Sequence, residues 1–277
     1  MKTISKIIIY PIKSLNGISV PSAKLTPAGF NNDRKFMLVD VIENKMITLR
    51  EFPDLYKLNV RFITNDLIQI ENKNKDQKPL LINLNHLSDL NDIKKVKIWD
   101  DLVEVQHVYE EANDWFSNEL GIKCQLVQMA PNFLRQVDLR FAPPGQCVLF
   151  ADGFPYLICA ESTLNLINNH LEKQVSMIHF RPNIVVKGTQ PNEEYNWSSI
   201  NINNQTFCSF KPCARCKIIS IYPDSREIND EIIPLMAKKF NQQNKIIFGI
   251  NACWQNNMSH AELKVGDVLT SVNKTNL

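Results

Sequence analysis

The sequence lacks the features that mark membrane, secreted or nucleic-acid-binding proteins. No stretch approaches the roughly 18–20 apolar residues that span a bilayer, and the short apolar run 7–10 is followed at once by Pro11 and Lys13, too soon for a signal-peptide core of about 7–15 residues. With 31 basic and 29 acidic residues, the chain has little general attraction for nucleic-acid phosphates. We therefore expect a soluble, cytoplasmic protein with no membrane or nucleic-acid partner.

Histidines and cysteines are too scattered to form a familiar metal or disulfide framework. The 5 histidines show no metal-ligand spacing, and 7 cysteines cannot all pair within the chain. A scatter of this kind is typical of a reducing compartment rather than of a disulfide-stapled fold. The cysteines are Cys124, Cys147, Cys159, Cys208, Cys213, Cys216 and Cys253.

The hydrophobic pattern predicts an α+β protein that is strongly β-rich. Apolar residues make up 44% of the 277 residues, enough for a substantial core. Short β-branched or apolar runs bounded by turn residues predict strands, and apolar residues at helical spacing predict helices. The expected strands are 4–10, 36–41, 58–63, 66–70, 80–84, 183–187, 200–210, 217–222, 245–252, two within 96–105, and a closing strand after 263–269; the expected helices are 110–120, 161–172 and 230–240.

The helix at 110–120, which Gly121 should end, is the expected domain boundary. The prediction is an N-terminal β domain over 1–120 and a second, barrel-like domain with flanking helices over 121–277. Neither internal repeats nor low-complexity tracts are evident.

The segment F-C-S-F-K-P-C-A-R-C-K, residues 207–217, carries the most chemistry. Cys213 and Cys216 are expected on a loop between two strands, where a metal or substrate can approach. Lys211, Arg215 and Lys217 surround them. Neighbouring cations stabilise the thiolate, which is the form that binds metals or attacks electrophiles.

Four interpretations of this pair are open from the residues alone. Two half-buried cysteines with no role is the simplest. Zinc would need two more ligands, and no second C-x-x-C is present. A thioredoxin-type pair should run directly into a helix, whereas the β-like run 218–222 follows here. Cys208, Cys213 and Cys216 have a plant-type iron–sulfur spacing with Cys253 as a distant fourth ligand, but the bulky residues 210–212 suit a cluster loop poorly.

Several separated segments, taken in order, resemble one family: MOSC-domain proteins with an extra N-terminal MOSC-associated β domain, which include the mitochondrial amidoxime reducing component and its bacterial relatives. No single motif is specific, but the order covers nearly the whole chain. The segments are I-Y-P-I-K-S-L-N-G at 9–17, D-R-K-F-M-L-V-D at 33–40, M-I-T-L-R-E-F-P at 46–53, F-A-D-G-F-P at 150–155, F-R-P-N-I-V-V at 180–186, the C-x-x-C, and the closing F-G-I-N and L-K-V-G-D-V-L.

The resemblance implies a molybdenum–pterin cofactor (Mo-molybdopterin) whose only protein ligand to the metal is Cys216, which is therefore also the catalytic residue. Cys213 is not expected to ligate. Residues implied at the pterin and its phosphate are Lys13, Ser14, Arg34, Lys35, Gly153, Phe154, Arg181, Asn183, Ala214 and Arg215. Arginine suits phosphate because it binds bidentately, and sulfur suits a metal already held by a dithiolene.

The resemblance further implies a reductase that converts N–OH to N–H in a small N-hydroxylated substrate. Some bacterial relatives carry a C-terminal ferredoxin-like domain; because the sequence stops at Leu277, we expect a separate electron-donor protein. The alternative is a cofactor carrier or sulfur-transfer module, as in cofactor sulfurases. A complete sulfurase is not expected, because this sequence shows no aminotransferase-like domain, but carriage of the cofactor is compatible with it. Pyridoxal phosphate binding is associated with the family only by annotation.

Structural roles compete with these assignments. Lys13, Arg34 and Arg50 are also interpretable as surface charges beside strands. Arg181, which precedes a proline, is also interpretable as a salt-bridged structural residue. Asp267 in V-G-D is expected to form a turn.

Overall fold

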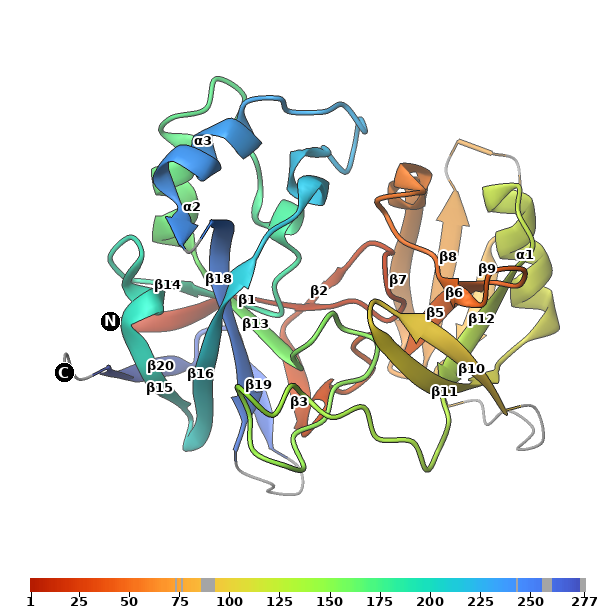
Figure 1. Ribbon diagram of the computed structural model, residues 1–277, viewed down its shortest axis with the longest axis horizontal. Helices are drawn as coiled ribbons and strands as arrows, with labels where there is room; N and C mark the ends of the chain where they lie inside the picture. The colour runs from red at the N-terminus through yellow and green to blue at the C-terminus, as the bar shows by residue number, and fades with distance from the viewer. Residues whose placement is uncertain (73, 76, 86–92, 243, 256–260, 275–277) are drawn as a thin grey trace.

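A computed structural model describes the chain except residues 73, 76, 86–92, 243, 256–260 and 275–277. Two β-rich halves stand side by side (Figure 1), and in the described residues only three α-helices accompany the strands. This confirms the β-rich α+β class. None of these helices combines the length and apolar character needed to cross a membrane.

The N-terminal half is a closed barrel with a small sheet beside it. The barrel order is β10-β11-β12-β5-β6 and the sheet order is β7-β8-β9. The segments 66–70 and 80–84, which are expected as strands, are present as β8 and β9, and these two strands pair antiparallel. Bounds are β5 Phe36–Asp40, β6 Lys45–Met46, β7 Leu58–Thr64, β8 Leu67–Asn72, β9 Leu80–Asn83, β10 Ile93–Ile98, β11 Asp101–His107 and β12 Cys124–Met129, with the 3-10 helix η1 at Pro53–Lys57.

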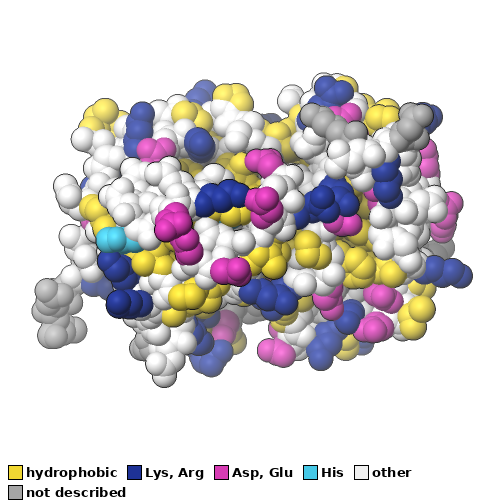
Figure 2. All heavy atoms as spheres, turned by 90° about the horizontal axis from the view of Figure 1, so that it is seen from above, with side chains coloured by type: hydrophobic (Ala, Val, Ile, Leu, Met, Phe, Trp, Pro, Cys, Tyr) yellow, Lys and Arg dark blue, Asp and Glu magenta, His cyan; other side chains and the backbone are white. Residues whose placement is uncertain are grey.

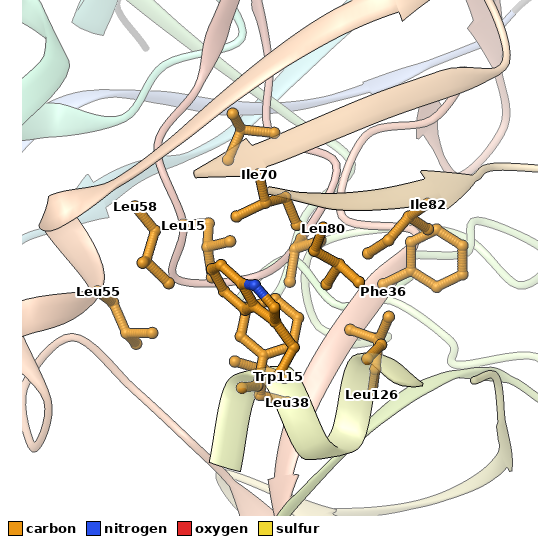
Figure 3. Packing of buried hydrophobic residues seen from close by; sticks show 14 of the residues in the cluster. Leu15, Phe36, Leu38, Leu55, Leu58, Ile70, Leu80, Ile82, Trp115 and Leu126 are labelled. Carbon is orange, nitrogen blue, oxygen red and sulfur yellow. The ribbon is translucent and has the colours of Figure 1, made fainter. Parts of the chain in front are cut away.

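Helix α1, Glu110–Leu120, forms where the sequence predicted it. Glu110 and Glu111 lie in its first turn, where their negative charges interact favourably with the positive end of the helix dipole. Gly121 ends it with φ 70°, a left-handed conformation that favours glycine. Trp115 packs among aliphatic side chains from the neighbouring strands (Figure 3), which fixes the helix against the N-terminal core.

The other half is a large sheet with two helices beside it. Its order is β13-β14-β1-β20-β15-β16-β18-β17, with β2 on β1 and a further β13–β18 pairing; a second sheet has the order β19-β3-β4. Bounds are β1 Lys2–Ile9, β2 Ile18–Val20, β3 Ser22–Thr26, β4 Gly29–Phe30, β13 Tyr156–Ala160, β14 Ile184–Lys187, β15 Trp197–Ile202, β16 Gln205–Ala214, β17 Asn241–Gln242, β18 Lys245–Trp254, β19 Glu262–Lys264, β20 Val268–Asn273, α2 Glu161–Asn168 and α3 Ile232–Lys239.

The first strand ties the two ends of the chain together. β1 pairs with β14 and with β20, so the opening residues of the chain lie in the sheet of the C-terminal half. The chain then passes into the barrel and returns through residues 130–155, which run between the halves (Figure 1). Segments that cross between the halves are therefore the ones able to build a shared site.

Three predicted elements differ from the structure. The expected strand 200–210 is a hairpin, because Asn203 and Asn204 take left-handed φ values of 48° and 63° and turn the chain between β15 and β16. The expected strand 217–222 is instead the 3-10 helix η4, Lys217–Ser220. Helix α2 ends at Asn168, before the expected 172. The remaining 3-10 helices are η2 Met177–Phe180 and η3 Glu193–Asn196.

The interior acid Glu194, in η3, gives stability a pH dependence. Its Oε2 accepts a hydrogen bond from Thr163 Oγ1 (2.8 Å), while Oε1 has no partner among the described residues. Burial raises the pKa of Glu194 to about 7, against opposition from hydrogen bonds that favour the carboxylate. The folded state thus holds the proton more tightly than the unfolded chain, so stability falls as pH rises from about 4.5 through 7.

We expect Glu194→Gln to remove this loss, which amounts to up to about 3 kcal/mol between about pH 5 and about pH 8. Urea unfolding of both proteins at the two pH values measures it. Burial lowers the pKa of His179 to about 4, which makes stability rise with pH below about 6.5; this contribution is common to both proteins and cancels in the comparison. Parallel pH profiles would contradict the assignment.

Candidate functional site

A cavity of about 120 Å³ lies where segments from both halves meet. Its walls come from the turn after β1, the chain before β5 and after β6, the β10–β11 turn, the segment 150–154, and the chain that follows η2 and β16. The lining residues are Lys13, Ser14, Arg34, Thr48, Leu49, Arg50, Trp99, Phe150, Ala151, Asp152, Gly153, Phe154, Leu157, Phe180, Arg181, Asn183, Cys213, Arg215, Cys216, Ile218 and Asn251.

Most of the site residues implied by the sequence line this cavity, but two do not. Lys35 donates instead to the carbonyl of Leu84 in the N-terminal half. Ala214 is the last residue of β16 and is absent from the lining. Although Lys35 follows Arg34 directly, its side chain extends toward Leu84 and not into the cavity. The residues that do line the cavity are Lys13, Ser14, Arg34, Gly153, Phe154, Arg181, Asn183, Arg215 and Cys216.

The cysteine pair is placed differently from the expected loop. Cys213 belongs to β16, whose pairing with β18 is irregular between Pro212 and Ala214, and Cys216 is the N-cap of η4. The feature used against a thioredoxin-type pair, a strand after the second cysteine, is therefore wrong. Both sulfur-bearing residues are half-buried and line the cavity.

The iron–sulfur alternative does not fit this geometry. Cys208 and Cys213 lie along one extended strand, and five residues of strand span about 16 Å, too far for ligands of one cluster. Cys208 is instead the direct cross-strand partner of Cys253. Among the described residues, no three His, Cys, Asp or Glu side chains gather as a metal site, so a metal in the cavity would need most of its ligands from a bound cofactor.

Arg215 holds the first cysteine and the η2 end together. Its Nη1 donates to Cys213 Sγ at 3.0 Å, and its Nη2 donates to the carbonyl of Phe180 at 2.9 Å. Burial acts to lower the pKa of Arg215, but the neighbouring sulfurs of Cys213 and Cys159 outweigh it and raise that pKa. This guanidinium therefore stays charged beside Cys213.

Lys13 is buried and anchors the segment that forms one cavity wall. Its Nζ donates to the Phe150 carbonyl (2.9 Å) and to Asp152 Oδ1 (2.6 Å). Burial lowers the pKa of Lys13, and Asp152 opposes that shift. Crowding by protein atoms would raise the pKa of Asp152, yet the Lys13 charge and hydrogen bonds from Lys13 and Trp99 hold it below its usual range. Although the Asp152 side chain is open to the cavity, the pair is ionic.

Arg34 and Arg181 enclose the ring of Tyr10. Their guanidinium carbons lie 4.1 and 4.5 Å from its centroid. Arg34 is held by Asp33 (2.6 Å) and by the Arg181 carbonyl (3.1 Å). The surface-charge interpretation is wrong for Lys13 and Arg34, which are only 6% and 8% exposed. In the described part of the chain Arg181 makes no salt bridge, whereas the interpretation of Arg181 as a structural residue requires one.

Backbone strain is concentrated around the cavity. Ser14, Arg34, Trp99 and Arg181 have φ values of 72°, 44°, 52° and 53°, in the left-handed region that is costly for such side chains. Among the other described non-glycine residues, this conformation occurs only at asparagines and Arg226. Strain of this kind persists where the surrounding structure enforces it, commonly at functional sites.

Three buried guanidinium nitrogens of the lining lack partners among the described residues: Arg50 Nε, Arg181 Nη1 and Arg215 Nε. Five lining residues are cationic, whereas Asp152 is the one acid in the lining. By contrast, on the outer face shown in Figure 2 the basic and acidic side chains are interspersed. Buried donors without acceptors are costly, so an anionic ligand in the cavity would stabilise these nitrogens.

Five further residues line the cavity although none of them was assigned a functional role from the sequence: Thr48, Arg50, Trp99, Asp152 and Asn251. Arg50 and Asp152 stand inside motifs at 46–53 and 150–155, a signal available from the sequence. Trp99 lies in a β-turn with no such motif. Asp267 accepts a hydrogen bond from the Lys264 amide (2.8 Å), which confirms its turn-forming role.

Comparison with known proteins adds independent findings. Residues 1–123 match the family described as MOSC N-terminal beta barrel domain, and residues 145–270 match the MOSC domain. A molybdenum cofactor sulfurase of Oryza sativa is 29% identical over 89% of this chain, which spans only 32% of that relative. The chain thus covers about a third of such sulfurases.

A shorter relative is matched over more of its length. Mitochondrial amidoxime-reducing component 1 of Mus musculus is 29% identical over 86% of this chain and 70% of its own. Among solved structures, the YuaD protein from Bacillus subtilis covers 97% of this chain and 94% of its own at 10% identity, with a TM-score of 0.42, which is too low to support an argument.

Proposed function

We propose that this chain, which belongs to the proteins that join an N-terminal MOSC β-barrel domain to a MOSC domain, binds a molybdenum–pterin cofactor in its cavity and reduces N-hydroxylated compounds. The single observation that carries the proposal is the cavity itself, in which Cys216 lies within a set of buried, incompletely paired cations. The predicted division into domains at 120 and 121 and the cytoplasmic location remain proposals.

The residues present fit such a cofactor. A pterin phosphate is an anion, and the unpaired guanidinium nitrogens of Arg181 and Arg215 are donors of the type that phosphate accepts. Lys13 and Arg34 supply fixed positive charge whose geometry is already set by Asp152 and Asp33. Because these donors are oriented before binding, little ordering remains to oppose cofactor capture.

Cys216 is the residue that would ligate molybdenum. It lines the cavity at the start of η4, whereas the sulfur of Cys213 is engaged by Arg215. A soft thiolate suits a metal that already carries sulfur ligands. The bound group would supply two-electron oxygen-transfer chemistry at a metal that keeps an open position for substrate.

The overall reaction balances as N–OH plus two electrons and two protons giving N–H and water. The electrons would come from a separate donor protein. Asp152, which Lys13 holds ionised, would keep this cationic wall in place. The rings of Phe150 and Phe154 would restrict water in the cavity that they line.

A second candidate is a carrier or sulfur-transfer module, which is favoured by the similarity to molybdenum cofactor sulfurases. Such a protein would bind the cofactor in the same cavity without reducing N–OH.

Turnover separates the two functions. The chain is expressed in a host that makes molybdopterin, and reduction of benzamidoxime by a chemical reductant is followed as benzamidine formation. We expect benzamidine in proportion to bound molybdenum. Bound molybdenum without benzamidine would favour carriage, and absence of molybdenum would refute both.

A further inference from the structure

A second hollow adjoins the cavity, and no function assigned above uses it. It is a groove of about 320 Å³ that shares Thr48, Arg50 and Trp99 with the cavity and extends to Lys45 and Lys97 on the barrel. The cavity and the groove therefore have a common wall.

The common wall is a fixed stack of an arginine on a tryptophan. The Arg50 guanidinium carbon lies 4.2 Å from the Trp99 ring centroid. Trp99 is held at φ 52° in the β10–β11 turn, and its Nε1 donates to Asp152 Oδ1 at 3.2 Å. A guanidinium stacks well on planar groups, so this wall offers a flat, positively charged surface to a planar ligand.

The groove also carries positive charge that the protein does not neutralise. Lys97 and Lys45 are direct partners across β10 and β6, and like charges opposite each other are destabilising. Lys45 is bound by Glu43 (2.6 Å) and by Glu51 (3.2 Å), the one acid that lines the groove among the described residues. Lys97 makes no ion pair within the described residues. The Arg50 Nε likewise has no acceptor there. An anion bound between Lys97 and Arg50 would offset the repulsion between the two lysines and would accept a hydrogen bond from Arg50 Nε.

We propose that the groove binds a planar, negatively charged substituent of the substrate, so that Arg50, Trp99 and Lys97 select N-hydroxylated compounds that bear a carboxylate. This specificity rests on the proposed function, because the N–OH end of the same molecule would occupy the cavity.

Direct binding tests the groove without turnover. Trp99 is half-buried while Trp115, Trp197 and Trp254 are 8%, 0% and 2% exposed, so ligand quenching of tryptophan fluorescence reports mainly on Trp99, with Trp99→Phe as the spectroscopic control. The probes are 4-carboxybenzamidoxime and neutral benzamidoxime. We expect the carboxylated probe to bind about tenfold more tightly, with a preference that weakens as salt rises.

Charge removal then tests the named residues. Arg50→Gln and Lys97→Gln should each reduce the ratio of the two affinities severalfold. Lys95→Gln is the matched control, because Lys95 is an exposed lysine on the same strand that does not line the groove; its ratio should equal that of the wild type. Equal affinity for both probes, or a ratio unchanged by both charge removals, would overturn the proposal.

Turnover and a nucleotide probe separate the remaining outcomes. Reduction of both probes with no preference in kcat/KM would reject the groove and leave the proposed function intact. A carboxylate preference in binding without reduction of either probe would reject the reductase function but not the groove. Cytidine monophosphate serves as a competitor. If it displaces the carboxylated probe, the groove binds a nucleotide, for example one attached to the cofactor, and the proposed selection of substrates is overturned.

Discussion

Cys216→Ala is expected to leave the purified protein with little molybdenum and to lower amidoxime reduction by more than about 100-fold, beyond the range typical of losing an outer-shell partner of a metal ligand. The reason is that the other sulfur in the described cavity lining, that of Cys213, is already engaged by Arg215 Nη1 and does not replace the lost ligand. Metal analysis and turnover on the same preparation measure the two effects.

Cys213→Ser is the matched control. Serine retains an acceptor for Arg215 Nη1, which donates to Cys213 Sγ, so molybdenum content should stay within about twofold of the wild type, since the change keeps the hydrogen bond. If instead Cys213→Ser lost the metal and Cys216→Ala kept it, the ligand assignment would be reversed.

Arg135→Met is expected to destabilise the fold by about 3 kcal/mol and to lower cofactor content. Arg135 is 6% exposed and donates to Asp101 Oδ2 (2.7 Å) and to the carbonyls of Leu149, Ala151 and Asp152 (3.1, 2.6 and 3.0 Å). Its loss leaves several acceptors unpaired at about 1 kcal/mol or more each. The released segment also carries both acceptors of Lys13, so the cavity wall loses its anchor.

Urea unfolding and molybdenum analysis measure these two effects. Arg140→Met tests the same chemical change nearby. Arg140 is 81% exposed, and its one ion pair within the described residues is with Asp138, two residues away. Its replacement should therefore change stability by less than about 0.5 kcal/mol. Equal unfolding midpoints for the two variants would show that Arg135 does not hold the wall.

Periodicity and local turn chemistry were sufficient for the three helices and for a part of the strands. Strands without a predicted counterpart are β2, β3, β4, β6, β12, β13, β17 and β19. Helix α1 matches its predicted range because acids at its start, apolar spacing and Gly121 all agree. The prediction of a strand over 217–222 is wrong because the apolar residues of this run suit either a strand or a buried turn of helix. Ile219 is fully buried in η4, and packing rather than β-branched composition decided its conformation.

The sequence by itself determined the β-rich class and the individual motifs, because each depends on residues close together in the chain. The family resemblance carried by the order of those motifs implied the cysteine proposed as the metal ligand. Only the tertiary structure decided which cations share the cavity. Lys13 meets the carbonyl of Phe150, 137 residues away, while Lys35, beside Arg34, turns toward Leu84. Trp99 lines the cavity from the β10–β11 turn, where its φ is in the left-handed region. Long-range contacts and side-chain direction cannot be read from neighbouring residues, since one step along an extended chain reverses the side on which a side chain lies.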